Sequence, residues 1–284
     1  MWSRPKESLE SNLFQFPYLP ALQIERLMSL INTQVQGHLL LIELNRPEKM
    51  NAFNRQMLTE LAEAYTQLED DPNLWCGLVH ARGEHFTSGL DLGDVGPAVM
   101  KGENLFVDDL VDPAQTIGRK RSKPIVFAVK GYCLTIGIET LLAADIAIAG
   151  ADTRFGQIEI KRGYIPFGGA TVRMVQRSGY GNAMRYLLTG DIFSAEEALR
   201  IGMVQEVTKG DPYARALAIA ETITKQAPLA VQATITSSQE SLEEGPEKAM
   251  QSLLPVARQL MQTEDAAEGL KSFLERRDAV FKGR

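Results

Sequence analysis

The chain has 284 residues, of which 44% are hydrophobic and 23% are charged, and its formal net charge at pH 7 is −6. Such a chain can bury the core of one large globular domain or of two small ones. The acidic balance argues against nucleic acid as a main partner, because phosphate binding requires a basic face, and no stretch approaches the ~20 consecutive apolar residues of a membrane span.

The first 28 residues differ from the rest of the chain. Residues 1–27 contain three prolines, mixed charges and no apolar run of signal-peptide length. Glutamates at 7, 10 and 25 also argue against a transit peptide. We therefore expect residues 1–28 to be a flexible extension, followed by a core domain at 29–210 and a helical region at 211–284.

Cysteine and histidine usage points to neither a disulfide nor a metal site. Cys76 and Cys133 stand in apolar contexts without CxxC spacing, which predicts buried thiols in a reducing compartment and hence a cytoplasmic protein. His80 is predicted within a strand and His85 beyond the next turn, so we expect no shared metal ion.

In chain order, the first half alternates between strand and helix patterns. Short apolar runs bounded by turn residues predict strands at 37–44, 75–81 and 124–129. Asn54 is the expected N-cap of a helix that ends at 70–72. Repeated strand, turn and helix units of this kind predict an α/β core with helices on the outside.

Between the second and third strands the pattern is weaker. Residues 93–112 show little periodicity, and we expect a mobile segment over the site, followed by a helix at 114–120. The basic run at 119–123 is interpreted as the solvated end of that helix, with anion binding as the alternative.

The second half begins with short elements and ends in helices. A helix is predicted at 136–144, short strands at 146–149 and 153–156, and helices at 170–178 and 182–188 separated by a break at 179–181. Ser194 and Glu197 have capping-box spacing and open a helix that runs through Ile201. Four further helices are predicted at 213–226, 229–242, 247–261 and 266–281. Since such a tail cannot easily bury every apolar stripe on one domain, we expect an oligomer.

Two glutamates, Glu139 and Glu159, stand in apolar or glycine-rich surroundings. Burial there raises a carboxyl pKa, as proton transfer requires. Glu139 falls in the first turn of a predicted helix, where the helix dipole opposes that effect. The alternatives are a solvated glutamate for Glu139 and, for Glu159, a loop residue paired with Lys161 or Arg162.

The segment Phe86-Thr87-Ser88-Gly89-Leu90-Asp91-Leu92 places small residues around a glycine. Tight backbone geometry of this kind leaves amide N–H groups free to point at a ligand, as an oxyanion site requires. The alternative is a plain turn.

Together these segments resemble the enoyl-CoA hydratase/isomerase family, the crotonases, over residues 33–284. The resemblance is carried by an opening loop, two oxyanion segments, an acid-bearing segment and a C-terminal signature. These are Leu44-Asn45-Arg46-Pro47 with Met50-Asn51-Ala52; 86–92 and 131–139; Phe155-Gly156-Gln157-Ile158-Glu159; and 263–265 with 273–277 and 281–284.

The resemblance implies a spiral of ββα units, a C-terminal trimerisation region, and an acyl-CoA thioester as substrate, which places the protein in fatty-acid metabolism. It implies that the backbone N–H groups of Leu90 and Ile136 form the oxyanion hole. It also implies a homo-oligomer, either a trimer or a dimer of trimers, and no cofactor, because coenzyme A is part of the substrate. Residues expected to bind substrate are Met50, Ala52, Ser88, Gly89, Asp91 and Leu92.

In hydratases of this family both acidic positions are glutamates that hold one water. By this resemblance Glu139 orients and deprotonates water and Glu159 protonates C2, with the exchange of roles in the reverse direction left open. This chain departs from the family at Thr135 and Ile136, where consecutive glycines are frequent, at Leu90, where alanine is common, and at Ile158, where proline is frequent. The larger side chains at Leu90, Thr135 and Ile136 narrow the expected pocket, and the change at Ile158 is expected to shift the carboxylate of Glu159.

Several reactions remain open beside syn hydration of a 2-enoyl-CoA. Double-bond isomerisation would need Glu159 alone, and hydrolysis or dehalogenation would share the oxyanion hole. A non-catalytic acyl-CoA-binding or RNA-binding member of the family is an alternative of another class, although RNA binding does not fit an acidic chain.

Overall fold

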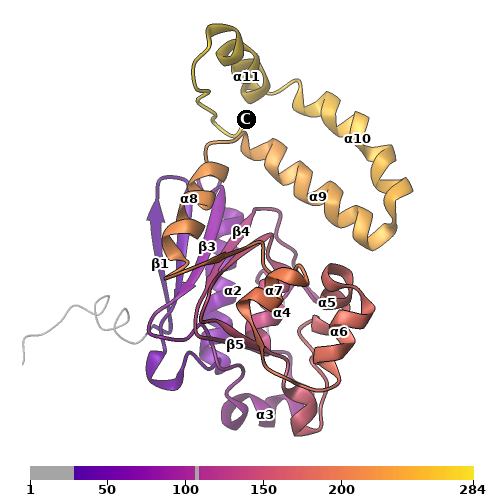
Figure 1. Cartoon of the computed structure of the whole chain (residues 1–284). Helices are drawn as coiled ribbons and strands as arrows, with labels where there is room; N and C mark the ends of the chain where they lie inside the picture. The colour runs from indigo at the N-terminus through magenta and orange to yellow at the C-terminus, as the bar shows by residue number, and fades with distance from the viewer. Residues whose placement is uncertain (1–28, 106–108) are drawn as a thin grey trace, which may run out of the picture.

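A computed structural model describes residues 29–105 and 109–284, so the extension expected at 1–28 lies outside the described residues (Figure 1). The main sheet has six strands in the order β1-β2-β3-β4-β6-β9. Only the β1–β2 pair is antiparallel, and the remaining neighbours are parallel. The strands are β1 (Ile31–Gln36), β2 (Leu39–Leu44), β3 (Cys76–Ala81), β4 (Ile125–Val129), β6 (Ile146–Gly150) and β9 (Glu206–Thr208).

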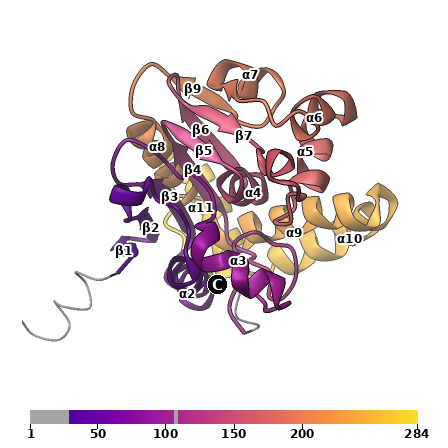
Figure 2. The same ribbon diagram turned by 90° about the horizontal axis from the view of Figure 1, so that it is seen from below.

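The strands predicted from apolar runs lie inside this sheet because both of its faces are covered. Along β2, Leu40 and Ile42 join the apolar cluster that includes α2 (Arg55–Asp70) and α4 (Ile136–Ala143). Leu39 and Leu41 join the opposite cluster with α8 (Tyr213–Ile223). Figure 2 shows α4 and α8 on the two sides of the sheet. A strand buried on both faces is apolar at every position, which is why these runs do not alternate.

The edge strand β1 was not predicted. It alternates apolar with polar residues and becomes exposed toward its end at Gln36, so it lacks the apolar run that marked the other strands. Its pairing with β2 through the turn at Gly37 and His38 supplies the backbone hydrogen bonds that the sequence pattern does not reveal.

A repeated unit explains how the site is assembled. After each of β4 and β6 the chain adds a short strand to a second sheet, β5 (Tyr132–Leu134) or β7 (Arg154–Gly156), and then enters helical structure. β7 also pairs antiparallel with the two-residue β8 (Phe193–Ser194). Single bridges extend this second sheet, joining Thr87 to Cys133 and Phe53 to Leu90. The helices that follow therefore begin side by side at one edge of the second sheet.

Two expectations between β3 and β4 were wrong. Residues Leu92–Met100, which lacked periodicity, form helix α3. Residues 114–120 are not helical, because the buried Asp112 carboxylate accepts hydrogen bonds from the N–H groups of Ala114 (2.8 Å) and Thr116 (2.6 Å) and folds the segment into turns. Asp side chains compete with helices in this way by bonding to nearby backbone amides.

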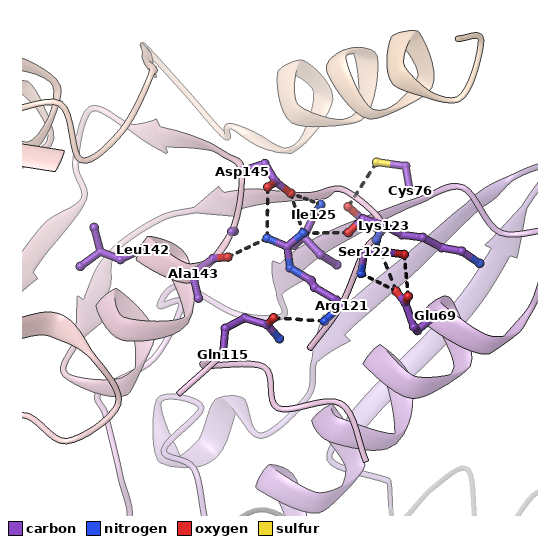
Figure 3. Close-up of polar contacts among 12 residues, drawn as sticks. Glu69, Cys76, Gln115, Arg121, Ser122, Lys123, Ile125, Leu142, Ala143 and Asp145 are labelled. Carbon is purple, nitrogen blue, oxygen red and sulfur yellow. Dashed lines mark hydrogen bonds and ion pairs between the residues drawn. The ribbon is translucent and has the colours of Figure 1, made fainter. Parts of the chain in front are cut away.

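The basic run at 119–123 is neither a solvated helix end nor an open anion site. Arg121 and Lys123 are only 3% and 5% exposed. Figure 3 shows the Arg121 guanidinium between Asp145 and the carbonyl of Ala143, with Nη1 2.8 Å from Asp145 Oδ2 and Nη2 2.6 Å from the carbonyl oxygen. Lys123 Nζ donates to the carbonyls of Leu68 (2.8 Å) and Asp71 (2.6 Å). We call Glu69, Arg121, Ser122, Lys123 and Asp145 the Arg121 cluster.

Helices dominate the second half, largely as predicted. Ser194 caps α7, accepting from Glu197 N at 3.3 Å, but the Glu197 carboxylate bonds to Tyr186 and Arg200 instead of closing a capping box. Only Gly179 separates α5 from α6, so the break is shorter than predicted. The helices here are α5 (Ala170–Ser178), α6 (Tyr180–Leu187), α7 (Ala195–Arg200), α9 (Pro228–Glu244), α10 (Pro246–Leu260) and α11 (Glu264–Glu275).

The last three helices form an arm beyond the end of the main sheet, whereas α8 packs on that sheet (Figure 1). α11 ends earlier than predicted, at Glu275, because Arg276 adopts a left-handed conformation with φ 54°. The tail then folds back, and the Asp265 carboxylate accepts from the N–H groups of Lys282 (2.7 Å) and Gly283 (2.9 Å).

Both cysteines are buried and unpaired, as predicted. Among the described residues, no helix is both long enough and apolar enough to cross a lipid bilayer.

Candidate active site

A cavity of about 260 Å³ lies among α2, the segments on either side of α3, the first turn of α4 and the loop before α5. Leu90 from the segment before α3, Ile136 from the first turn of α4 and Gly168 from the loop before α5 all line it. The fold thus brings together three segments that are far apart in the sequence. Its lining residues are Leu58, Leu90, Val99, Gly102, Glu103, Asn104, Leu105, Leu110, Asp112, Thr116, Ile117, Gly118, Ile136, Phe167 and Gly168.

The backbone N–H groups of Leu90 and Ile136 have no hydrogen-bond acceptor within the described part of the chain. Leu90 is flanked by backbone bonds, from Phe53 N to Gly89 O and from Asp91 N to Phe53 O, both 2.8 Å long, which fix its peptide without using its own N–H. Ile136 N is the first amide of α4, where helical geometry leaves donors unpaired. Two such donors beside one cavity can bind a carbonyl oxygen that gains negative charge.

Thr135, just before the second of these donors, has an unusual backbone. Its φ of 49° and ψ of −115° lie in a region that β-branched residues rarely occupy. Its side chain fills the space beside Gly89, where an added Cβ would lie 2.2 Å from Thr135 Oγ1. The Thr135 side chain thus occupies the space that a side chain at position 89 would need. The two oxyanion segments therefore pack together only with glycine at 89.

Glu139 is 2% exposed, which rules out the solvated alternative. Its Oε1 accepts hydrogen bonds from the N–H groups of Gly168 (2.6 Å) and Ala170 (3.3 Å). A Cβ at position 168 would lie 2.6 Å from Glu139 Oε2, so glycine allows this close approach. Burial raises the pKa of Glu139 to about 7, although the two amides and the positive charge of Arg173 act to lower it.

Glu159 opens a single 3₁₀ turn, Glu159–Arg162, where a loop was expected, and is 3% exposed. Burial raises the pKa of Glu159 to about 7, and the negative charge of Glu139 raises it further, so the two carboxylates lie within electrostatic range of each other. Its Oε2 is buried without a partner in the described residues, and no ion pair there joins it to Lys161 or Arg162. A buried carboxyl oxygen without a partner is what a proton donor to a bound ligand requires.

The six residues expected to bind substrate gather in two adjacent segments. Ser88 N donates to the carbonyl of Met50 at 2.9 Å, and Gly89 accepts from Phe53. Met50 and Leu92 are exposed, and Ala52 is half-buried. Asp91 instead forms an ion pair with Arg46 at 2.9 Å, which ties the opening loop to the start of α3. None of the six lines the cavity itself, although Gly89 and Asp91 are the chain neighbours of Leu90, which does.

Sequence reasoning missed three contributors to the site. Gly168 and Ala170 hold Glu139 through their backbone amides, and Arg173 places a positive charge near it. The pair Gly168-Gly169 was a visible signal, because adjacent glycines permit close approach of a side chain. The role of Arg173 had no local signal. Among the described residues no group of three or more potential metal ligands occurs.

Two free amides, an apolar cavity and two carboxyl groups with a raised pKa define a site of proton-transfer chemistry next to a polarised carbonyl. The comparisons with known proteins agree with this class. The Enoyl-CoA hydratase/isomerase family model matches residues 34–284, and the chain belongs to this family.

Named relatives cover nearly the whole chain. An enoyl-CoA hydratase of Mycobacterium tuberculosis is 32% identical over 254 residues, 88% of this chain and 95% of the relative. The 2,3-dehydroadipyl-CoA hydratase of Escherichia coli is 31% identical over 262 residues, 90% of this chain and 100% of the relative. A crystal structure of a probable enoyl-CoA hydratase/isomerase from Mycobacterium abscessus has a TM-score of 0.87 and 44% identity, covering 90% of this chain and 99% of that one. The protein therefore has a crotonase fold.

Proposed function

We propose that this protein is an enoyl-CoA hydratase that adds water syn across the double bond of a 2-enoyl-CoA thioester. The observation that carries the proposal is the pair Glu139 and Glu159. Both are buried, both have a pKa raised to about 7, and Glu139 bonds to Gly168 in the wall of the cavity that Leu90 and Ile136 line.

The amides of Leu90 and Ile136 bind the thioester oxygen and stabilise the enolate that forms there. One such donor contributes about 2.7–4 kcal/mol in comparable sites. Oε1 of Glu139 accepts hydrogen bonds from two backbone amides, so Oε2 is the oxygen that accepts the proton of a water molecule. The water oxygen bonds to C3, the C2–C3 π electrons move into the enolate, and protonated Glu159 then delivers its proton to C2.

The starting state has Glu139 ionised and Glu159 protonated. Two neighbouring carboxyl groups that both titrate near pH 7 hold one proton between them over a useful pH range. After the reaction Glu139 carries the proton and Glu159 does not, so a proton must return before the next turnover. In dehydration the two residues exchange roles.

The experiment incubates the purified protein with 2-hexenoyl-CoA and follows loss of the conjugated double bond together with mass gain by one water. We expect hydration by the wild type and by the surface variant Glu196→Gln. If no 2-enoyl-CoA thioester is hydrated, the proposal is wrong.

Double-bond isomerisation is the second candidate, because Glu159 alone could move a proton between carbons. The two are separated by assaying Glu139→Gln with 2-enoyl and 3-enoyl thioesters. We expect this variant to lose hydration, and hydratase activity retained at the wild-type level would refute the role given to Glu139.

A homo-oligomer, a trimer or a dimer of trimers, is part of the proposal. It is supported by exposed apolar side chains along the arm and its tail: Met250, Leu253, Leu254, Met261, Leu270, Phe273, Leu274 and Val280. Groups of this kind on helices that pack little on the core of their own subunit fit burial by another subunit. Light scattering over a range of concentrations would give the mass, and a monomer at every concentration would contradict it.

Hydration neither oxidises nor reduces the substrate, so the proposed reaction calls for no cofactor beyond the coenzyme A of the substrate itself. We expect kcat to be unchanged after dialysis against a metal chelator. The unpaired thiols of Cys76 and Cys133 fit a reducing compartment, which supports a cytoplasmic protein.

A further inference from the structure

The cavity beside the two amides is mainly apolar beyond its catalytic end. Half of the residues in its remaining wall are hydrophobic: Leu58, Val99, Leu105, Leu110, Ile117 and Phe167. Its volume of about 260 Å³ falls just below the ~300–1,000 Å³ of pockets that bury drug-sized ligands. An acyl chain of short to medium length fills such a space.

The charged residues in this wall are both acidic, and no lysine, arginine or histidine is among the described residues that line it. Asp112 is 2% exposed, and its carboxylate is already committed to its own loop. Its Oδ2 accepts from Thr116 N (2.6 Å), Thr116 Oγ1 (2.7 Å) and Ile117 N (3.2 Å), and its Oδ1 accepts from Ala114 N (2.8 Å). Asp112 therefore adds negative charge without offering a donor.

Glu103, just after α3, is the second acid, and its side chain is 40% exposed. Arg55 Nη2 lies 3.4 Å from Glu103 Oε2, and Lys101 Nζ lies 4.0 Å from Oε1. Neither cation lines the cavity. Glu103 thus lies in the cavity wall and forms ion pairs with two cations that do not line it.

We propose that this cavity selects uncharged apolar enoyl chains of short to medium length and excludes chains that end in a carboxylate, with Glu103 as the specificity-determining residue. The inference rests on the proposed function. A terminal carboxylate entering the cavity would lose its water, find no cation and meet like charges on Glu103 and Asp112.

Membership of the enoyl-CoA hydratase/isomerase family does not decide whether an acyl chain that ends in a carboxylate is excluded. The Escherichia coli relative that is 31% identical is named a 2,3-dehydroadipyl-CoA hydratase, and an adipyl chain ends in a second carboxyl group. The inference therefore concerns the residues of this chain rather than the fold.

The experiment compares kcat/KM for thioesters matched in length, 2-hexenoyl-CoA against 2,3-dehydroadipyl-CoA and 2-octenoyl-CoA against 2-octenedioyl-CoA. We expect the uncharged member to be preferred by about 100-fold in at least one pair, because like charges brought together without water cost several kcal/mol. Equal efficiency in both pairs would overturn the proposal.

Glu103→Gln tests the residue itself. This substitution removes one negative charge from the cavity wall and abolishes the ion pairs with Arg55 and Lys101. We therefore expect the preference to fall about tenfold, mainly through a lower KM for the diacid thioester. Glu63→Gln, an exposed acid on α2 that does not line the cavity, is the matched control and should leave the preference unchanged. A preference that survives intact in Glu103→Gln would refute the role of Glu103.

A binding measurement tests the selectivity of the cavity independently of the proposed reaction. Calorimetry with the saturated analogues hexanoyl-CoA and adipyl-CoA measures selectivity without turnover. If hexanoyl-CoA binds more tightly but no enoyl thioester is hydrated, the cavity assignment stands and the proposed reaction fails. If both enoyl classes are hydrated equally, the reaction stands and the selectivity fails.

Discussion

Helix α4 has buried charged side chains at both ends, and the two ends differ in how those charges are bonded. At its C-terminal end Arg121 donates to the carbonyls of Ala143 (2.6 Å) and Lys123 (2.7 Å) as well as to Asp145, so both terminal nitrogens are occupied. At its N-terminal end Glu139 has two amide donors, and its neighbour Glu159 keeps a buried oxygen without a partner in the described residues.

The helix dipole does not explain this difference. It favours an acid at the N-terminus and a cation at the C-terminus, so both ends agree with it. Each end also keeps one buried atom without a partner in the described residues, Arg121 Nε at one and Glu159 Oε2 at the other. What differs is the sign of the charges that surround the buried group. The Arg121 cluster consists of opposite charges and carbonyl acceptors. Burial in an apolar setting raises the pKa of both glutamates to about 7, and the negative charge of Glu139 adds to the rise at Glu159. Compensated buried charge indicates a structural role, and uncompensated buried charge indicates a chemical one.

The largest expected effect is on catalysis. Glu159→Gln keeps the size of the side chain but removes its proton, so we expect kcat for hydration to fall about 100- to 10,000-fold with the fold unchanged. Glu69→Gln in the Arg121 cluster is the matched control. Its carboxylate accepts from Ser122 N (2.9 Å) and Oγ (2.6 Å), so this variant should lose stability but not kcat. Equal kcat losses in Glu159→Gln and Glu69→Gln would show that the two ends of α4 do not differ in their role in catalysis.

The next effect is on stability. Arg121→Met removes the donor of the Ala143 carbonyl and the positive charge beside Asp145, whose carboxylate keeps only the Ile125 N–H, at 2.8 Å, as a donor within the described residues. We expect the free energy of unfolding to fall by about 3–5 kcal/mol. Arg119→Met breaks the exposed ion pair with Asp70 and should cost at most about 1 kcal/mol. Urea denaturation measures both, and a loss as small in Arg121→Met as in Arg119→Met would show that the cluster is not structural.

A smaller effect concerns pH. The pKa of Glu139 is raised from 4.5 to about 7 on folding, so the folded state binds more protons than the unfolded chain between these values. This contribution to stability is present below pH 4.5 and is lost as the pH rises through 7. Glu139→Gln should therefore be more stable than the wild type at pH 8 by about 1–3 kcal/mol, with a smaller difference at pH 5. Denaturation of both proteins at pH 5 and pH 8 measures these differences. A wild type more stable than Glu139→Gln at pH 8 would contradict the prediction.

The smallest expected effect is at Thr135. Glycine there relieves backbone strain of about 1–3 kcal/mol but adds chain entropy of about 0.5–1 kcal/mol in the unfolded state. We expect Thr135→Gly to be about 1 kcal/mol more stable than the wild type and to have a lower kcat, because the contact with Gly89 that spaces the two amides is lost. Thr135→Ser, which keeps Oγ1, is the control. If Thr135→Gly keeps the wild-type kcat, the contact between Thr135 and Gly89 does not position the two amides.

Local patterns in the sequence were sufficient for the strands β2, β3, β4, β6 and β7, the capped helix α2 and the position of Glu139 in the first turn of α4, but not for β5 and β9. Each depends on neighbours within a few residues, such as the Asn54 side chain that accepts from Met57 N at 2.9 Å. The same holds for the resemblance that led to the family, because its motifs are short and ordered along the chain.

Only the tertiary structure decided which charges are compensated. Asp112 turned a predicted helix into turns, Arg121 met Asp145 from another strand, and Glu139 met the amides of the loop before α5. The cavity likewise depends on residues from α2, α3 and α4 that are far apart in the sequence. Side chains of identical type therefore have different roles, because the free energy of a buried charge depends on partners that are distant in the sequence.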